Sequence, residues 1–363
     1  MKPNFPTDYT SVMERLSSVN PVAYCSNRNY IDGDVTSLSP YISRGVISTK
    51  DVLESFRNRG FSPVENEKFL QELAWRDYWQ RVWQEKNIEE DLKNEQLNVE
   101  HGEMIRVVNN ANVGITAIDE AIHQLYETGY MHNHLRMYVA SVCTNIARAQ
   151  WKAPAQWMYY HLLDADWASN ALSWQWVSGA NSNKKYFANQ ENINRFCYSN
   201  DQHTFLDKSY DELTRMGIPN VLKSTEKQEL KTVLPKKKEV IINPGKAIIL
   251  YTWYNMDPKW RNGDDLNRIL ILEPSHFEKY PISAKSLQFL IDLGQNIDNL
   301  QVFVGEFNEL QEKHPMQSYI FKEHPTNLHF QGTEDQRDWL SSVSGYYPSF
   351  FSFWKKVKKE IIQ

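Results

Sequence analysis

The sequence predicts a mainly α protein with a second, smaller α/β part. Up to about residue 222, apolar residues recur with the 3.6-residue period of helices, and strand-like alternation is nearly absent. Residues 223–243 are polar and charged and contain a proline, so we expect a linker there. Short apolar runs and a helical segment follow. We therefore predict an all-helical domain over residues 1–222 and a small Rossmann-like α/β domain over residues 244–363.

The helices of the first part follow from composition and spacing. Residues 66–85 contain no glycine or proline, and Glu72, Trp75 and Arg76 recur at three- and four-residue steps, so they share one helix face. Gly129 is expected to end a helix, because glycine adopts the left-handed conformation that is common there. The other helices are predicted over residues 115–126, 132–151 and 154–163.

The second part has the spacing of a βαβ unit. Residues 247–253, 268–272 and 300–306 are short apolar runs typical of strands. Residues 283–297 form the helical segment between the last two runs, with Ser283 as the N-cap. Strand, helix and strand at this spacing predict a small parallel sheet. The three lysines at 236–238 are more typical of a solvated linker than of a DNA-binding patch.

Composition excludes several classes of protein. The three cysteines are far apart, which argues against a disulfide framework and against a zinc site, and no metal site is expected. No 18-residue apolar run is present, so no membrane span is expected, and the first ten residues do not resemble a secretory signal. We therefore expect a cytoplasmic monomer. The net charge of −5 means that any DNA site would be a local basic patch.

Four segments carry residues suited to chemistry. The hydroxyl-rich turn at 36–41 could bind an anion such as a pyrophosphate, although an ordinary helix N-cap would look the same. Glu72, Trp75 and Arg76 could hold a flat polar ligand, or they could be a core tryptophan beside a surface ion pair. Segments 129–137 and 164–176 supply an Arg and an Asp-x-Asp pair, which are costly to bury unless they are partnered. Together these groups suit a planar cofactor that carries a pyrophosphate.

The order of these segments resembles the photolyase/cryptochrome family over roughly residues 1–210. The motifs are TSLSPY at 36–41, ELAWRDYW at 72–79, TGYMHNHLRM at 128–137 and LLDADWASNALSWQW at 162–176. The resemblance implies the all-helical FAD-binding domain of that family and FAD as the cofactor, reduced to FADH⁻ in the active form. It assigns the cofactor contacts to Tyr24, Thr36, Ser37, Leu38, Ser39, Asn133, Arg136, Asp164, Asp166 and Asn170. Arg136 and Asp164 look like the salt bridge over the flavin, and Asn170 matches the position that faces flavin N5.

The resemblance also extends to a substrate pocket. Five positions match the contacts to a cyclobutane pyrimidine dimer in repair enzymes of the family, namely Glu72, Trp75, Asn133, Met137 and Trp176. A carboxylate can hydrogen-bond a base edge, and indole rings can replace the stacking that a flipped-out base loses. Arg28 and Arg76 match DNA-backbone contacts, with Lys184 and Lys185 as further candidates.

Two features depart from the family pattern. Trp174 and Trp151 match the first two tryptophans of the chain that reduces the flavin, but residues 84–125, where the third is expected, contain no Trp, Tyr or Phe. Either another aromatic residue, such as Trp157, Tyr159 or Tyr160, ends the electron chain, or light-driven reduction is impaired. The α/β segment follows the flavin domain, whereas the family usually begins with an α/β antenna domain. Residues 244–363 could be a permuted or degenerate antenna domain, or a structural cap. Nothing in the sequence names an antenna chromophore.

The resemblance implies a deoxyribodipyrimidine photolyase, a carbon–carbon lyase that repairs pyrimidine dimers in DNA with light and reduced FAD. Glu72, Asn170, Trp151 and Trp174 would carry the chemistry. One alternative is a cryptochrome-like blue-light sensor on the same domain, which the acidic charge and the missing third tryptophan favour. A second alternative is a helical protein with a tryptophan-rich core and no cofactor.

Overall fold

The computed structural model describes residues 3–362 and divides the chain into two compact units. Unit 1 combines residues 22–35 and 85–230 with the first four residues, and unit 2 combines residues 5–21, 36–84 and 231–363. The junction at residue 230 lies inside the predicted linker. Segment 36–84, however, belongs to the same unit as the α/β part. The predicted domains over 1–222 and 244–363 stay a prediction.

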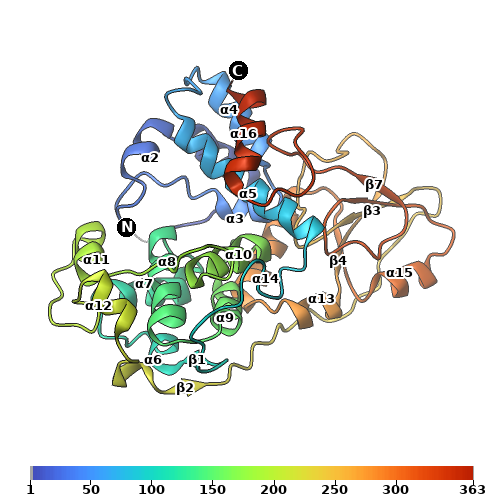
Figure 1. Cartoon of the computed structure of the whole chain (residues 1–363). Coiled ribbons are helices and arrows are strands. Elements are labelled where there is room, and N and C mark those ends of the chain that lie inside the picture. Colours follow the sequence, from blue (N-terminus) through green and yellow to red (C-terminus); the bar gives the residue numbers. More distant parts are fainter. Residues whose placement is uncertain (1–2, 363) are drawn as a thin grey trace. The chain divides into compact units, whose positions relative to one another are not determined.

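Unit 1 is a helical assembly, and Figure 1 labels its elements. Its helices are α2 (Pro21–Asn27), α6 (Arg106–Asn109), α7 (Thr116–Thr128), α8 (Asn133–Ser141), α9 (Lys152–His161), α10 (Trp167–Ser178), α11 (Gln190–Cys197) and α12 (Tyr210–Arg215), with the short turns η1 (Val142–Ile146) and η2 (Asn220–Leu222). Unit 1 also contains a two-stranded antiparallel ribbon, which consists of β1 (Met104–Ile105) and β2 (Thr225–Glu226). The predicted end of α7 is confirmed, because Gly129 has a φ of 72° and donates its N–H to Leu125 O.

The single helix predicted over residues 132–151 is wrong. Helix α8 passes at Val142 into the π-helix η1, and the chain then leaves the helix. Arg148 has a φ of 60°, and Ala149 forms an isolated parallel bridge with His101. A left-handed residue cannot continue a right-handed helix, so the pattern of apolar residues continues where the helix does not.

Unit 2 contains a five-stranded, fully parallel sheet in the order β5-β4-β3-β6-β7. Its strands are β3 (Ile248–Tyr251), β4 (Asn267–Leu272), β5 (Gln301–Val304), β6 (Tyr319–Lys322) and β7 (Thr333–Asp335). Its helices are α1 (Tyr9–Ser18), α3 (Ser39–Ser43), α4 (Thr49–Asn58), α5 (Glu67–Glu85), α13 (Pro274–Lys279), α14 (Ala284–Leu293), α15 (Phe307–Lys313) and α16 (Phe350–Ile361), with the turn η3 (Gly294–Asn296). The parallel sheet is confirmed, and Ser283 caps α14 by accepting the N–H of Ser286.

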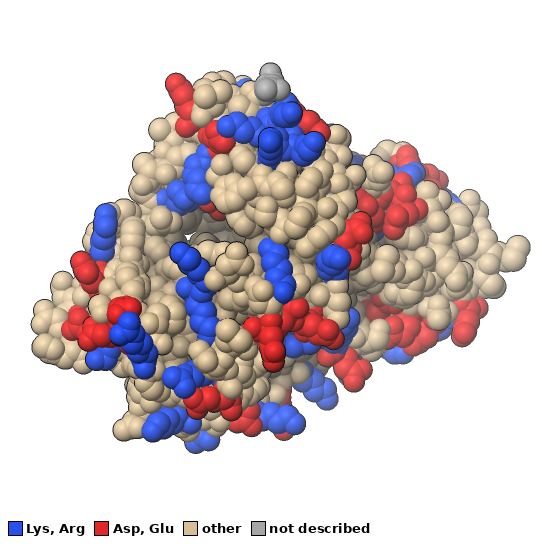
Figure 2. All heavy atoms as spheres, in the orientation of Figure 1, with Lys and Arg blue, Asp and Glu red and all other residues tan. Residues whose placement is uncertain are grey.

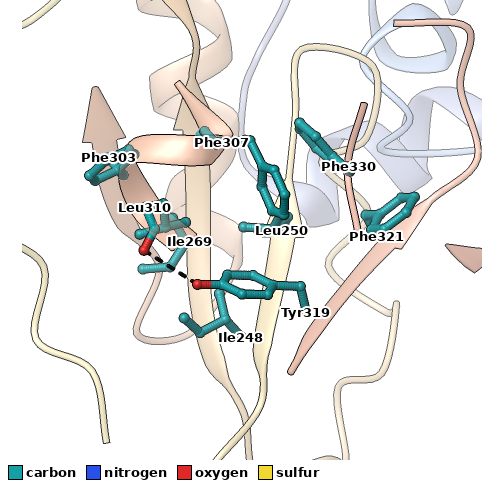
Figure 3. Close-up of a cluster of buried hydrophobic side chains, with 10 residues drawn as sticks. Ile248, Leu250, Ile269, Phe303, Phe307, Leu310, Tyr319, Phe321 and Phe330 are labelled. Atoms are coloured by element: carbon teal, nitrogen blue, oxygen red, sulfur yellow. Dashed lines mark hydrogen bonds between the residues drawn. The ribbon is translucent and has the colours of Figure 1, made fainter. Parts of the chain in front are cut away.

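The core of the sheet is apolar and rich in aromatic rings (Figure 3). Every residue of β3 and β4 is buried, as expected for parallel strands that are covered on both faces. The rings of Phe307 and Phe330 stack at 4.8 Å between centroids, and the hydroxyl of Tyr319 donates to Leu310 O at 3.3 Å. The buried polar atom is therefore paired, which removes most of the cost of placing it there.

Helix α16 packs on the N-terminal helices of the same unit (Figure 1). Lys358 Nζ contacts Glu67 Oε2 at 2.6 Å, and Arg57 donates to Ile361 O at 3.0 Å. Its outer face carries lysines, and Figure 2 shows basic side chains gathered there. Lys355, Lys356 and Lys359 are exposed. Helix α16 is therefore amphipathic, with an aromatic inner face and a basic outer face.

Candidate functional site

The predicted site residues are divided between the two units. Unit 1 contains Tyr24, Arg28, Asn133, Arg136, Met137, Trp151, Asp164, Asp166, Asn170, Trp174, Trp176, Lys184 and Lys185. Unit 2 contains Thr36, Ser37, Leu38, Ser39, Glu72, Trp75 and Arg76. The two sets are described in turn.

The predicted ion pair of unit 1 is present. Arg136 of α8 binds the carboxylate of Asp164 through both terminal nitrogens, each at 3.1 Å. Its Nε donates to Met131 O at 2.8 Å, which fixes the plane of the guanidinium. Only 4% of the Asp164 side chain is exposed. Two parallel hydrogen bonds compensate for burying this carboxylate and leave a rigid charged pair on the segment that leads into α10.

The start of α10 places two further candidates. Asp166 caps the helix, because its Oδ1 accepts the backbone N–H of Ser169 at 2.8 Å. One turn later, the amide of Asn170 donates to Ala155 O of α9 at 2.8 Å. The cap and this bond fix both side chains by local structure. A planar group at this position would meet an amide whose orientation is already set.

Helix α8 carries two of the predicted substrate-binding residues on one face. Asn133 is exposed and Met137 is half-buried, and they are one helical turn apart. His134, which lies between them in sequence, is directed elsewhere: its Nδ1 contacts Asn29 O at 2.9 Å and its ring packs on Phe196.

The sequence interpretation missed His132, the N-cap of α8. Its Nδ1 accepts the backbone N–H of His134 at 3.2 Å, so the neutral ring serves as the cap. Burial lowers the pKa of His132 to about 4, helped by the nearby charge of Arg136. The capping geometry therefore depends on a histidine that stays neutral at physiological pH.

The remaining N-terminal residues of unit 1 lie together. Arg28 donates to Cys25 O at 3.2 Å, and its guanidinium lies 5.8 Å from the centre of the Tyr24 ring. This contact keeps the cation against an aromatic face on helix α2.

The two tryptophans of the predicted electron chain are buried. Trp174 is 2% exposed and Trp151 is fully buried. The segment that lacks the third tryptophan binds Trp151 through polar groups instead: Asp91 Oδ1 accepts from the indole Nε1 at 2.6 Å, and Gln96 Oε1 accepts from the Trp151 backbone N–H at 2.9 Å. The sequence interpretation missed both partners, because neither matched an aromatic pattern.

The structure separates two of the three aromatic residues considered as a replacement, Trp157 and Tyr159. Trp151 packs on Trp167 at 6.4 Å between ring centres, and Trp167 contacts Tyr159 edge-on at 5.5 Å. Trp157 belongs to a different group, because its Nε1 donates to the Tyr126 hydroxyl at 3.0 Å. Tyr159 is therefore the candidate connected to Trp151 through an intervening ring.

The C-terminal end of α10 carries a tryptophan that is partly exposed to solvent. Trp176 is 37% exposed, and its recorded ring neighbour is Tyr186 at 5.8 Å. Lys184 is exposed, whereas Lys185 donates its ammonium to Leu97 O at 2.7 Å. The two lysines were predicted as one kind of DNA contact, but only Lys184 extends into solvent.

In unit 2, residues 36–39 form a tight turn before α3. Ser37 has a φ of 51°, an uncommon value for a residue other than glycine, and the Thr36 hydroxyl accepts the backbone N–H of Leu38 at 3.3 Å. Leu38 is buried, whereas Ser37 and Ser39 are half-buried. No partner within residues 3–362 is recorded for the hydroxyls of Ser37 and Ser39, so the turn offers two donors, as a phosphate contact requires.

Helix α5 of unit 2 carries the remaining candidates. Trp75 stacks face to face on Phe350 of α16, with ring centres 3.7 Å apart and an angle of 9°. Glu72 pairs with Lys68 at 3.0 Å, and Arg76 donates to the Ser43 hydroxyl at 2.7 Å. Phe350 thus covers one face of the predicted stacking residue. The sequence interpretation missed it, because it lies 275 positions later in the chain.

Comparison with known proteins agrees with the motifs. The family model described as the FAD binding domain of DNA photolyase matches residues 69–240. The deoxyribodipyrimidine photo-lyase of Alkalihalophilus pseudofirmus is 31% identical over 163 residues, which cover 43% of this chain and 34% of the relative. The enzyme of the same name from Streptomyces griseus is 29% identical over 171 residues, covering 45% of this chain and 36% of the relative. The chain thus matches about a third of the length of these relatives.

A solved structure also aligns with the chain. The Synechocystis cryptochrome is 21% identical and has a TM-score of 0.49, over 54% of this chain and 44% of that chain. The family match begins after the turn at 36–39 and contains the Arg136–Asp164 pair, α8 and α10. Within residues 3–362, no helix combines the length and apolar character needed to cross a bilayer. Residues 69–240 of this chain are therefore similar to the FAD-binding domain of DNA photolyases.

Proposed function

We propose that the chain binds FAD and repairs cyclobutane pyrimidine dimers in DNA under blue light. Two observations within the segment that matches the family model carry the proposal together, the Arg136–Asp164 pair and the fixed amide of Asn170. A rigid pair of opposite charges can orient a flat polar ring.

FAD in its reduced form supplies the electron on excitation by light. The residues of the chain would bind the cofactor and orient it. Asn170 offers a fixed amide to a ring nitrogen, and the free hydroxyls of Ser37 and Ser39 can donate to phosphate oxygens. Asp164 holds Arg136 in place, so the guanidinium presents a fixed charge.

The dimer contacts are proposed for Glu72, Asn133, Met137, Trp75 and Trp176. Trp176 is the open ring, because more than a third of it is exposed. A base stacked on the covered face of Trp75 would have to displace Phe350. Arg28, Arg76 and Lys184 are the proposed contacts to DNA phosphates, and their binding should weaken as salt rises.

The test uses the purified full chain, reconstituted with FAD and photoreduced with an external donor. We expect a flavin absorption spectrum and light-dependent loss of dimers from an oligonucleotide. Asp164→Asn should lose flavin, whereas Asp211→Asn, a matched change in an exposed ion pair, should keep it. The repair proposal is contradicted if the fully reduced protein leaves the dimers intact.

A cryptochrome-like sensor is the second candidate, and one observation favours it. Phe350 already occupies a face of Trp75 that a repair enzyme would use for a base. Trp176→Ala separates the two functions. A repair enzyme should lose affinity for dimer-containing DNA, while the photoreduction of a sensor should change little.

A further inference from the structure

Unit 1 contains an open pocket that the proposed function uses only at its rim, where Lys184 is a proposed DNA contact. Its volume is about 660 Å³, within the range of small-molecule sites. Three cationic and three aromatic residues line it, namely Arg148, Lys184, Lys185, Tyr186, Phe187 and Tyr210. All of its lining residues belong to unit 1, so the pocket is defined within that unit alone.

The walls of the pocket are fixed by hydrogen bonds. Arg148 donates to Met216 O at 3.1 Å and contacts Glu100 at 2.5 Å. Lys185 donates to Leu97 O, and the amide of Asn145 donates to Tyr186 O at 2.7 Å. The arginine backbone has a φ of 60°, a strained value for a residue with a side chain. Strain of this kind persists only where the surroundings hold it, and it is common at binding sites.

Of the three cations that line the pocket, Arg148 is paired with Glu100, whereas Lys184 and Lys185 have no carboxylate partner among the described residues. None of the described residues that line it is an aspartate or glutamate. Burial lowers the pKa of Lys185, and the like charge of Arg148 lowers it further, which places the two cations close together. The Glu100 carboxylate offsets the charge of Arg148, so the two lysines are the cations to which an anion in the pocket would be attracted.

The aromatic residues add a flat apolar surface. Tyr210 is half-exposed at the start of α12, and its proximity contributes to the raised pKa of Tyr186. Exposed rings beside cations are the combination that recognises a base and its phosphate, because every base has a face that can stack. Lys184 is exposed on the same rim.

We propose that this pocket binds a mononucleotide, with its phosphate on Lys184, Lys185 and Arg148 and its base against Tyr210. The volume of the pocket is large enough for a free mononucleotide, which is the ligand we propose. A nucleotide within a DNA strand shares the same chemistry and is distinguished by experiment. The proposal rests on unit 1 alone and does not depend on repair activity.

The experiment titrates the full chain, saturated with FAD so that the cofactor site is filled, with adenosine monophosphate by calorimetry. Lys184→Glu and Tyr210→Ala should each weaken binding at least tenfold. The first variant replaces a cation that attracts the phosphate with an anion that repels it, and the second removes the ring on which the base stacks. Lys223→Glu, an exposed lysine outside the pocket, should change binding less than twofold. Thermal unfolding verifies that each variant is folded.

A second measurement needs no variant. Acetylation of lysines, followed by mass spectrometry, should show that adenosine monophosphate protects Lys184 but not Lys223. Absence of nucleotide binding, or binding that both pocket variants leave intact, overturns the proposal. If a single-stranded octanucleotide binds in a Lys184-dependent manner and the mononucleotide does not, the proposed free ligand is wrong and the pocket belongs to a DNA strand.

Discussion

The surroundings of Trp75 in α5 and of Trp176 in α10 differ in how much of each indole is covered. Trp75 has Phe350 stacked on one face and Trp79 at 4.8 Å, both from its own unit. Trp176 has one recorded ring neighbour and is 37% exposed. The first indole therefore contributes to the packing of its unit, while the second is free to meet a ligand. A tryptophan can therefore stabilise the packing of a unit or remain available at its surface, and its neighbours determine which.

The largest effect is expected at the covered tryptophan. Phe350→Ala should destabilise unit 2 by about 3–5 kcal/mol, since it empties a buried site against Trp75. Urea unfolding measures this loss. The adjacent Phe351 is 69% exposed, so Phe351→Ala should cost at most about 0.5 kcal/mol. Equal losses in the two variants would show that α16 does not stabilise α5.

The stability of unit 1 near α10 is expected to depend on an ion pair and not on stacked rings. Asp164→Asn should destabilise unit 1 by about 3 kcal/mol, because it leaves the charge of Arg136 without its partner. The matched Asp211→Asn breaks an exposed i,i+4 pair and should cost less than about 0.5 kcal/mol. Similar unfolding curves for the two variants would mean that the Arg136–Asp164 pair contributes little to stability.

Acid should weaken the unit that contains Trp75. Burial lowers the pKa of His276 to about 3 and that of His324 well below its ordinary value. Between about pH 6.5 and 3, the unfolded chain takes up a proton at His276 that the folded chain does not, and His324 acts in the same direction. Each group therefore removes up to about 1.4 kcal/mol of stability per pH unit as the pH falls.

A variant isolates this effect. His276→Gln should lose less stability than the wild type when the pH is lowered from 7 to 5, because one such proton is no longer taken up. Urea midpoints at several pH values provide the comparison. Parallel pH profiles for the two proteins would contradict a neutral, buried His276.

The smallest effect on stability is expected at the open tryptophan. Trp176→Ala should cost about 1 kcal/mol, because the ring is only partly buried. If the proposed function holds, it should cost about 1–3 kcal/mol of binding to dimer-containing DNA, the value of a stacked base. Tyr198→Ala, at a 60% exposed ring, is the control for a nonspecific loss of binding.

The sequence predicted the features that depend on short-range signals. Helix α5 and the end of α7 at Gly129 follow from composition and spacing, and the Arg136–Asp164 pair follows from the cost of burying a lone charge. The break after η1 was missed because apolar spacing does not reveal the left-handed backbone of Arg148.

The contact between Trp75 and Phe350 depends on residues far apart in the chain. Periodicity within α5 shows that Trp75 lies on one helix face, but it does not show what covers that face. The pocket at Arg148 and Tyr210 has the same origin, since α12, η1 and loop segments far apart in the chain line it together. The roles proposed for the site residues stay predictions.

The pairing of α5 with α16 also has a consequence for protein synthesis. Glu67 and Lys358 are separated by 291 positions, and Arg57 and Ile361 by 304. A ribosome adds roughly 5–20 residues per second, so α16 emerges roughly 15–60 s after α5. During that time the aromatic face of α5 has no native partner from α16. The nascent chain therefore exposes an apolar surface that chaperones can bind, and slower translation would prolong that exposure.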